Sequence, residues 1–440
     1  MAKVRTKRQK AILKRRIFLC CLCLITVAAI ALLGLAVKGI VSLGKKGGSN
    51  GNSSTSSPKE PYIVSSATVV NTGDIMVHST QLDGAYDKST KQYDFSAFFK
   101  YTEKYFKEAD MATANLEVTF GGSGKRYSGY PAFNTPDSLA DVIKNAGINF
   151  LVTSNNHCYD TGLAGLKRTV SVLNEKGIPF TGTRDNTDTK TYAVRNVNGI
   201  KIGIANYTYE NKSEAGSKSI NGRIISTDAN ALINSFNYDR IDEFYTAAQE
   251  TVDAMKEDGA EFITFYMHWG EEYQLTPNRH QEAIAQRLSN IGVNLIIGDH
   301  PHVIQPIKLI HSEDSENTTV CAYSLGNAIS NQRKEIMVPE CTTGHTEDGM
   351  LFYYKLDKYS DGKVVLSGLN CIPTWVNKYK GGSGYQYSII PLENENFAST
   401  LGLDSSVQSK AAASYERTKA IVKDGLTECQ NEIGCEVTFK

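Results

Sequence analysis

The chain has 440 residues, of which 41% are hydrophobic and 21% are charged. This composition excludes a collagen-like, fibrous or wholly disordered protein and leaves room for one large domain or two ordinary ones. The 47 basic and 47 acidic residues balance, but residues 1–61 hold 12 Lys or Arg and one acid, Glu60. The remainder therefore carries 35 basic and 46 acidic residues, a balance of −11, which argues against nucleic acid as a partner.

A basic segment and an apolar run open the chain. Eight Lys or Arg residues within residues 1–16 precede an uncharged run of 21 residues from Ile17 to Val37. A helix of about 20 residues spans a bilayer core of ~30 Å, and flanking basic residues stay in the cytoplasm. A cleaved signal peptide is the alternative, although its apolar core is about 7–15 residues. We predict a retained single-pass anchor over residues 17–43, in the cell membrane, with the N-terminus cytoplasmic and the C-terminal domain extracellular.

The rest of the chain divides by composition. Residues 44–61 are rich in Gly, Ser and Asn, which is typical of a flexible linker. We predict a folded domain over residues 62–395 and a C-terminal tail over residues 396–440, with a helix over residues 408–422. Six cysteines lie beyond the apolar run, and an extracellular location permits disulfides; Cys429 and Cys435 are close enough in sequence to pair.

Strands and helices alternate through the first half of this domain. The hydrophobic spacing predicts strands over residues 67–73, 112–117, 150–154, 262–268 and 293–298, and helices over residues 94–111, 139–145, 163–175, 238–255 and 279–290. Asn198-Gly199 predicts the turn of a hairpin over residues 192–207. Further strands are predicted over residues 303–310, 319–324, 350–356 and 363–371. The pattern predicts an α/β fold with two sheets packed face to face and helices outside.

Ligand-type side chains follow several of the predicted strands. They are Asp74 and His78, Asn115 and Glu117, Asn155, Asn156, His157 and Asp160, His268, Glu271 and Glu272, and Asp299, His300 and His302. In open α/β sheets, ligands bind beyond the carboxyl ends of the strands. Because imidazole, carboxylate and amide oxygen suit a borderline divalent metal, these segments predict a site for Mn, Zn or Fe.

His300-Pro301-His302 is the most informative of these segments. Proline disfavours helical angles at the residue before it, and residues two apart in an extended chain point to one side. We therefore expect an extended segment that directs both imidazoles into one site. Other residues keep structural alternatives: Asp74 as a helix cap, His268 as a core histidine, and Asp160 as a cap for the helix that follows it.

Six motifs together resemble the CapA/PgsA family of poly-γ-glutamate capsule synthesis proteins. They are Gly73-Asp74, Asn115-Leu116-Glu117, Ser154-Asn155-Asn156-His157, His268-Trp269-Gly270-x-Glu272, Gly298-x-His300-Pro301-His302 and Tyr323-Ser324-Leu325-Gly326-Asn327. That family resembles the calcineurin-like metallophosphoesterases, which implies a four-layer α-β-β-α sandwich with one or two metal ions. The resemblance implies as metal ligands Asp74, Glu117, Asn156, His268, His300 and His302.

The same resemblance implies roles for other residues. His157 would be the general acid, Glu272 a second catalytic residue and Asn155 a substrate-binding residue, and Glu117 would stand in the place of a bridging aspartate. The Asp-x-His pair of the phosphoesterases is not kept, since His78 lies four residues after Asp74.

Two functional hypotheses follow. The first is a membrane-anchored metallohydrolase that acts on a phosphoester or an amide. The second is a non-catalytic accessory protein that binds the nascent anionic polymer, with Lys125 and Arg126 as a cationic clamp or as solvated loop charges. Both hypotheses predict the cell membrane, the polyglutamate polymer and other capsule-synthesis membrane proteins as partners, and no nucleic acid.

Overall fold

The computed structural model describes residues 60–212, 217–382 and 384–440. The predicted basic segment and apolar run lie outside the described residues, as does the predicted linker apart from Glu60 and Pro61. Within the described ranges, no helix combines the length and the apolar character needed to cross a bilayer. Residues 61–440 form one compact unit, which includes the C-terminal tail.

Two large sheets make up most of this unit. The nine-stranded sheet has the order β19-β18-β17-β1-β4-β5-β6, with β16 beside β1 and β20 beside β18. Its strands are β1 (Ile63–Ile75), β4 (Met111–Leu116), β5 (Phe150–Val152), β6 (Phe180–Thr181), β16 (Asn327–Ile329), β17 (Asp348–Tyr359), β18 (Val364–Lys380), β19 (Tyr385–Pro391) and β20 (Glu436–Phe439). Strands β1, β4, β5 and β6 run parallel to one another.

The seven-stranded sheet has the order β11-β8-β12-β13-β15-β14, with β7 beside β8. Its strands are β7 (Tyr192–Val197), β8 (Ile200–Tyr209), β11 (Ser235–Phe236), β12 (Phe262–His268), β13 (Leu295–Asp299), β14 (Ile304–His311) and β15 (Thr318–Leu325). Two small hairpins complete the strands: β2 (Tyr86–Asp87) with β3 (Gln92–Tyr93), and β9 (Lys218–Ile220) with β10 (Arg223–Ile225).

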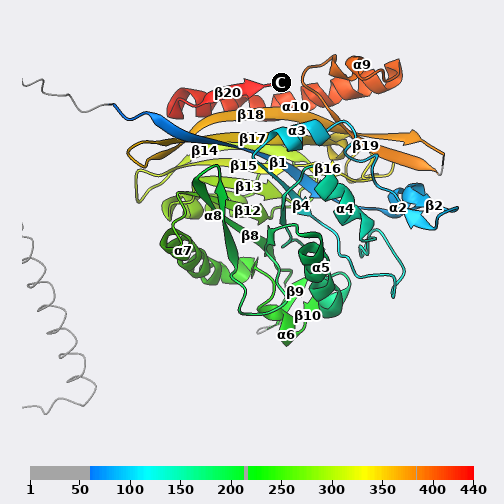
Figure 1. The fold of residues 1–440 in the computed structure, drawn as a ribbon, viewed down its shortest axis with the longest axis horizontal. Helices are drawn as coiled ribbons and strands as arrows, with labels where there is room; N and C mark the ends of the chain where they lie inside the picture. The colour runs from blue at the N-terminus through cyan, green and yellow to red at the C-terminus, as the bar shows by residue number, and fades with distance from the viewer. Residues whose placement is uncertain (1–59, 213–216, 383) are drawn as a thin grey trace, which may run out of the picture. The chain divides into compact units, whose positions relative to one another are not determined.

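The helices lie around these sheets. They are α2 (Ser79–Ala85), α3 (Glu103–Glu108), α4 (Ser138–Asn145), α5 (Gly162–Lys176), α6 (Thr227–Asn230), α7 (Ile241–Glu257), α8 (Arg279–Asn290), α9 (Phe397–Thr400) and α10 (Ser405–Ile433), with short 3-10 turns η1 (Tyr238–Arg240) and η2 (His345–Glu347). In Figure 1, α10 and β20 lie along β18 at one side of the unit, and α7 and α8 lie at the opposite side.

Alternation along the strands places apolar side chains on both faces of each sheet. Neighbouring residues of a strand point to opposite faces, so Val69 packs between the sheets with Ile202 and Phe352, whereas Val70 packs outward with helix residues such as Ile143. On the seven-stranded sheet, the outer face packs on α7 and α8. The layers therefore run helix, sheet, sheet, helix, and the predicted mixed α/β class is confirmed.

Most predicted elements are present. Residues 262–268 and 279–290 form β12 and α8 as predicted, and the hairpin turns at Asn198 and Gly199, whose φ angles are 50° and 83°. Both residues are thus in the left-handed region that this tight turn requires. The predicted tail helix is longer than expected and becomes α10, followed by β20.

The predicted helix over residues 94–111 is wrong for most of its length. Only α3 is helical; residues before it form successive turns, and Met111 already begins β4. Phe95 and Phe98 are buried in the core, and the Phe98 carbonyl accepts a hydrogen bond from the Ile389 amide of β19, at 2.9 Å. A carbonyl bonded to another strand is not available to a helical i→i+4 ladder.

Cysteine pairing is not seen either. All six cysteines that the structure describes are free and buried, including Cys429 and Cys435.

Candidate metal centre and cavity

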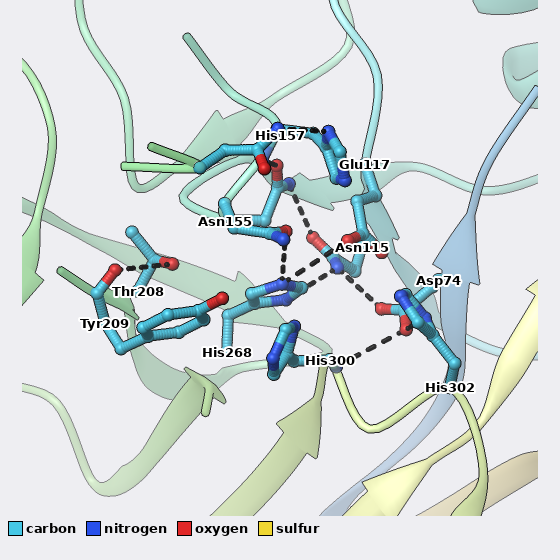
Figure 2. A network of polar contacts seen from close by, with 12 residues as sticks. Asp74, Asn115, Glu117, Asn155, His157, Thr208, Tyr209, His268, His300 and His302 are labelled. Atoms are coloured by element: carbon cyan, nitrogen blue, oxygen red, sulfur yellow. Dashed lines mark hydrogen bonds and ion pairs between the residues drawn. The ribbon is translucent and has the colours of Figure 1, made fainter. Parts of the chain in front are cut away.

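The predicted ligands converge at the carboxyl ends of strands from both sheets. Asp74 is the penultimate residue of β1, Glu117 follows β4, His268 ends β12, and His300 follows β13. All four side chains are buried. Figure 2 shows them facing one another, together with His302, in the space between the two strand edges.

Two glycines allow the backbone around Asp74 to close up. A Cβ on Gly73 would lie 1.8 Å from the Gly326 carbonyl oxygen, so any side chain there would collide with the backbone. Without it, the Asp74 amide donates to that carbonyl, at 3.2 Å. The glycines of two of the motifs therefore hold β1 against the end of β15, and Asp74 with it.

Asp74 is held by three donors. Its Oδ1 accepts from the Asn115 amide group at 2.7 Å, and its Oδ2 lies 3.0 Å from His302 Nδ1 and 3.3 Å from the His300 main-chain nitrogen. Burial alone would raise the pKa of Asp74, but the hydrogen bond and charge of His302 outweigh burial and lower it. Burial likewise opposes the charged form of His302, yet Asp74 raises the pKa of that imidazole. Asp74 is therefore a carboxylate ready to bind a cation.

Glu117 differs from Asp74 in lacking partners. It is fully buried, and neither carboxylate oxygen accepts a hydrogen bond from any described residue. The nearest basic group is His268 Nε2, 3.4 Å from Oε1 but not in hydrogen-bonding geometry. Burial, followed by the negative charge of Asp74, raises the pKa of Glu117 well above its ordinary value. A buried carboxyl without partners is costly, which marks this position as a place for a bound cation.

The backbone conformation of His300 and His302 differs from the expected one. The predicted extended segment is wrong: His300 has φ 97° and His302 has φ 56°, both in the left-handed region. Contacts on either side impose the bend, since the His300 amide donates to Asp74 and the His302 carbonyl accepts from Asn327 Nδ2 at 3.3 Å. Each such residue costs of order 1–2 kcal/mol, and both imidazoles still enter one site.

His268 lies between the two halves of the centre. Its Nδ1 is 3.2 Å from Asn115 Nδ2 and its Nε2 is 2.9 Å from Asn156 Oδ1. Burial lowers the pKa of His268 to about 3, so the imidazole is neutral and can act as a ligand. The tertiary structure thus brings Asn156 to the centre as well.

Two groups of ligand atoms could each hold a metal ion. One consists of Glu117, His300 and His302, and the other of Asp74, Glu117 and His268; in each group the atoms lie within 4.8 Å of one another. Glu117 belongs to both. The residues fit a divalent metal, because the unpartnered oxygens of Glu117 and the unpartnered Nδ1 of His300 are buried donors of electron pairs.

His157 is backed by a carboxylate, which corrects the interpretation of Asp160 as a helix cap. Thr161, not Asp160, precedes α5 as its N-cap residue. Asp160 Oδ2 lies 2.8 Å from His157 Nδ1 and also accepts from the Phe133 amide, at 2.6 Å. Because the carboxylate accepts from Nδ1, the ring is fixed in orientation and its Nε2 is left for other contacts.

A cavity of about 360 Å³ lies beside this centre. Its lining residues are His78, Tyr130, His157, Glu272, Tyr273, His302, Asn331, Gln332, Ile336, Met337 and Glu340. His302 belongs to the centre as well, so the cavity and the centre are continuous. The predicted catalytic residues His157 and Glu272 both lie on its wall.

The predicted substrate-binding residues do not line this cavity. Asn155 is buried, and its side-chain amide is hydrogen-bonded within the protein. Nδ2 donates to Asn115 Oδ1 and the Leu116 carbonyl, and Oδ1 accepts from the His157 amide. It therefore positions neighbouring residues. Lys125 and Arg126 are exposed on a loop, and the Lys125 ammonium donates to the Thr161 carbonyl at 3.0 Å.

Sequence reasoning missed the roles of four residues of the site. Asn115 was counted only as a ligand-type side chain and Asn327 only as part of a motif, yet both donate hydrogen bonds that position ligands. Tyr209 packs against His300 with ring centroids 4.8 Å apart and the ring planes tilted by 51°, and nothing in its local sequence indicates this. His78 was set aside because of its spacing from Asp74, but it lines the cavity. The contact between His157 and Asp160, in contrast, could have been inferred from their three-residue spacing.

Comparisons with known proteins agree with the motifs. The family described as "Bacterial capsule synthesis protein PGA_cap" matches residues 68–332. The "PGA biosynthesis protein CapA" of Bacillus subtilis (strain 168) is 27% identical over 343 residues, covering 76% of this chain and 80% of that protein. The "Capsule biosynthesis protein CapA" of Bacillus anthracis is 28% identical over 271 residues, covering 60% of each chain.

A solved structure, that of Haemophilus influenzae NAD nucleotidase (NadN), aligns with a TM-score of 0.44 and 14% identity, covering 84% of this chain and 67% of that one. The family match spans more than half of the sequence and contains all six predicted metal ligands. It confirms the resemblance stated from the motifs: the chain belongs to the bacterial capsule synthesis protein family PGA_cap.

Proposed function

We propose that this chain is a membrane-anchored protein of poly-γ-glutamate capsule synthesis or export, and that its buried centre binds divalent metal and hydrolyses a phosphoester or an amide. The observation that carries the proposal is Glu117, which is buried without hydrogen-bond partners and shared by both candidate ligand groups. A shared carboxylate supports a pair of ions, in agreement with the metallophosphoesterase-like arrangement that the motifs imply.

The ligands are Asp74, Glu117, His268, His300 and His302, with Asn156 beside His268. Mixed carboxylate and imidazole donors favour Mn, Zn or Fe over Mg or Ca. When bound, such an ion acts as a Lewis acid that polarises a phosphoryl or carbonyl oxygen. Asp74 and Asn115 fix the positions of their neighbours through the hydrogen bonds described above, so the donor set is pre-organised.

His157 supplies proton transfer in this proposal. Its Nδ1 is held by Asp160, and the ring lines the cavity, so Nε2 can hold a proton for a leaving group. Glu272 is exposed on the same wall. Its carboxylate is placed to contact the part of a substrate that extends away from the centre.

The biological assignment rests on the family and on the printed names of the Bacillus relatives. Poly-γ-glutamate is itself a chain of amides, so an extracellular amide hydrolase can trim or release it. The apolar run of residues 17–37 supports an anchor in the cell membrane, where other capsule-synthesis membrane proteins and the polymer are the partners.

Metal stoichiometry tests the centre most directly. We expect the purified protein to bind divalent metal, and His300→Gln and His302→Gln each to lose most of it, while His311→Gln, which changes an exposed histidine at the end of β14, retains it. Phosphoester and γ-glutamyl substrates assayed on the same samples separate the two reactions. A parent protein without metal, or ligand variants that bind as well as the parent, would favour the accessory-protein hypothesis.

The membrane assignment has its own test. Protease added to intact cells should cut within residues 44–61 and release a soluble fragment of about the size of residues 62–440. Protection of this segment until the cells are lysed contradicts the proposed orientation.

A further inference from the structure

We propose that His78 is a substrate-binding residue, and that its imidazole donates an Nε2–H hydrogen bond to an acceptor oxygen of the substrate, either phosphoryl or carbonyl. This inference rests on the proposed function, because it takes the cavity beside the metal centre as the substrate site. It concerns a histidine that the ligand motifs do not include.

His78 and His157 both line the cavity and flank the same buried aromatic side chain, Phe133. His78 precedes α2, and its ring meets Phe133 edge-on with ring centroids 5.3 Å apart. Phe133 meets the His157 ring in the same manner, at 4.7 Å. His78, His157 and His302 all line the cavity, so His78 shares with them the space in which a substrate beside the centre would lie.

The main chain of Asn331 determines which nitrogen of His78 carries the proton. The Asn331 amide donates to His78 Nδ1 at 3.2 Å. A backbone N–H can only donate, so Nδ1 holds a lone pair and the proton of the neutral ring is on Nε2. Gln81 Oε1 is also 3.3 Å from Nδ1, but Nδ1 cannot accept from the Asn331 amide and donate to this oxygen at the same time.

Asn331 itself is fixed from the opposite side. Its Oδ1 accepts from Lys378 Nζ at 3.0 Å and from the Tyr387 hydroxyl at 2.5 Å. Strands β18 and β19 therefore hold the segment that sets the His78 tautomer. Nε2 of His78 has no hydrogen-bond partner among the described residues, and a ligand oxygen would provide one.

The two cavity imidazoles are thus prepared for different tasks. His157 has a carboxylate on its Nδ1, which fixes the orientation of the ring and leaves Nε2 facing other partners. His78 has an N–H donor on its Nδ1, which disfavours the charged ring, and burial lowers its pKa to about 3. His78 is therefore a neutral ring with an N–H at Nε2, which suits donation to an acceptor oxygen.

The imidazole nitrogens can be read directly by NMR of the full chain in mild detergent, with ¹⁵N-labelled histidine. The His78 signals are identified by their loss in His78→Gln. We expect the neutral Nε2–H tautomer between pH 5 and pH 8, and a shift of its Nε2–H signal on addition of inorganic phosphate or γ-glutamylglutamate. Phosphate shifting the signal alone identifies the phosphoryl arm, and the dipeptide alone identifies the carbonyl arm.

Kinetics on the same protein give a second measurement. We expect His78→Phe to lower kcat/KM by about 10–100-fold with unchanged metal content, and His78→Gln, which retains an N–H donor, to recover part of the loss; His311→Phe is the matched control. A proton on Nδ1, or no shift with either ligand, overturns the inference even if the protein is an active metalloenzyme. A protein without metal or turnover whose His78 signal still responds refutes the proposed function and leaves the binding role standing.

Discussion

The centre and the entrance of the cavity are built in opposite ways. We call the floor the five residues Asp74, Glu117, His268, His300 and His302, and the rim the cavity residues Tyr130, Glu272, Tyr273, Ile336 and Glu340. Floor side chains are at most 3% exposed, whereas Tyr130 and Ile336 are 70% and 57% exposed. The floor lies at or next to the ends of strands, and the rim lies in loops between elements.

This difference indicates a division of labour. Strands that are hydrogen-bonded to a neighbouring strand on each side hold their side chains in well-defined positions, whereas loops can vary in sequence without loss of the fold. We infer that the floor determines which reaction is possible and that the rim determines which molecule is accepted. Changes in the floor should therefore affect metal and turnover, and changes in the rim should affect substrate affinity.

The largest effect is expected for Glu117→Gln. This substitution removes the carboxylate that both ligand groups share, so metal affinity should fall by more than about 100-fold, beyond the 10–100-fold typical of residues outside the ligand set. Metal content after dialysis measures it, with Glu271→Gln as an exposed control. Full metal occupancy in Glu117→Gln would remove the basis for a shared-carboxylate centre.

A large effect on turnover without loss of metal is expected next, for the proton-transfer pair. Loss of a general acid costs about 10²–10⁴ in rate, so His157→Gln should lower kcat by that factor. Asp160→Asn removes the partner of Nδ1 and should lower kcat by a smaller factor, about 10–100. Equal kcat values for parent and both variants would show that the pair does not take part in the reaction.

The pH dependence of the stability of the metal-free protein tests the same comparison. The pKa of Glu117 is raised in the folded chain above its ordinary value of 4.5, chiefly by burial. The folded chain therefore retains a proton that the unfolded chain releases above that pH, and stability falls as pH rises. Glu117→Gln has no ionisable group at this position and does not lose stability in this way. In the absence of metal, the stability of the variant relative to the parent should therefore increase as pH rises above 4.5. Thermal melts of both proteins in chelator measure it; an advantage that does not change with pH contradicts the burial argument.

The smallest effects are expected at the rim. Tyr130→Ala and Ile336→Ser change exposed side chains, so the free energy of unfolding should stay within about 0.5 kcal/mol of the parent value. KM should change by a few-fold with kcat and metal content unaltered. A rim variant that loses metal or kcat to the extent of a floor variant would break the proposed division.

Much of the fold could be predicted from local sequence. Residues 262–268 and 279–290 have the periods of a buried strand and an amphipathic helix, and both elements occur with these bounds. Asn198-Gly199 tolerates positive φ at both positions and forms the predicted turn. Where a sequence pattern depends only on the conformation of the residues that carry it, local interactions are sufficient to predict the element.

The ligand set was readable for a related reason. Each predicted metal ligand stands at or near a strand end, and parallel strands bring their carboxyl ends to one edge. The sequence could therefore indicate Asp74, Glu117, His268, His300 and His302 as one group before their distances were known. The family resemblance implied a bridging position for Glu117, but the distances that place this carboxylate in both ligand groups depend on the spacing between two different sheets and could not be read from the sequence.

The remaining features were decided by long-range contacts. Residues 94–102 have a helical pattern, but the Phe98 carbonyl is bonded to Ile389 in β19. His300 and His302 take positive φ angles because Asp74 and Asn327 bind their backbone. His78 owes its tautomer to Asn331, which lies 253 residues away in sequence. Local sequence determined which residues carry the chemistry; only the packing of two sheets decided their angles, partners and protons, because those depend on atoms that the local sequence does not contain.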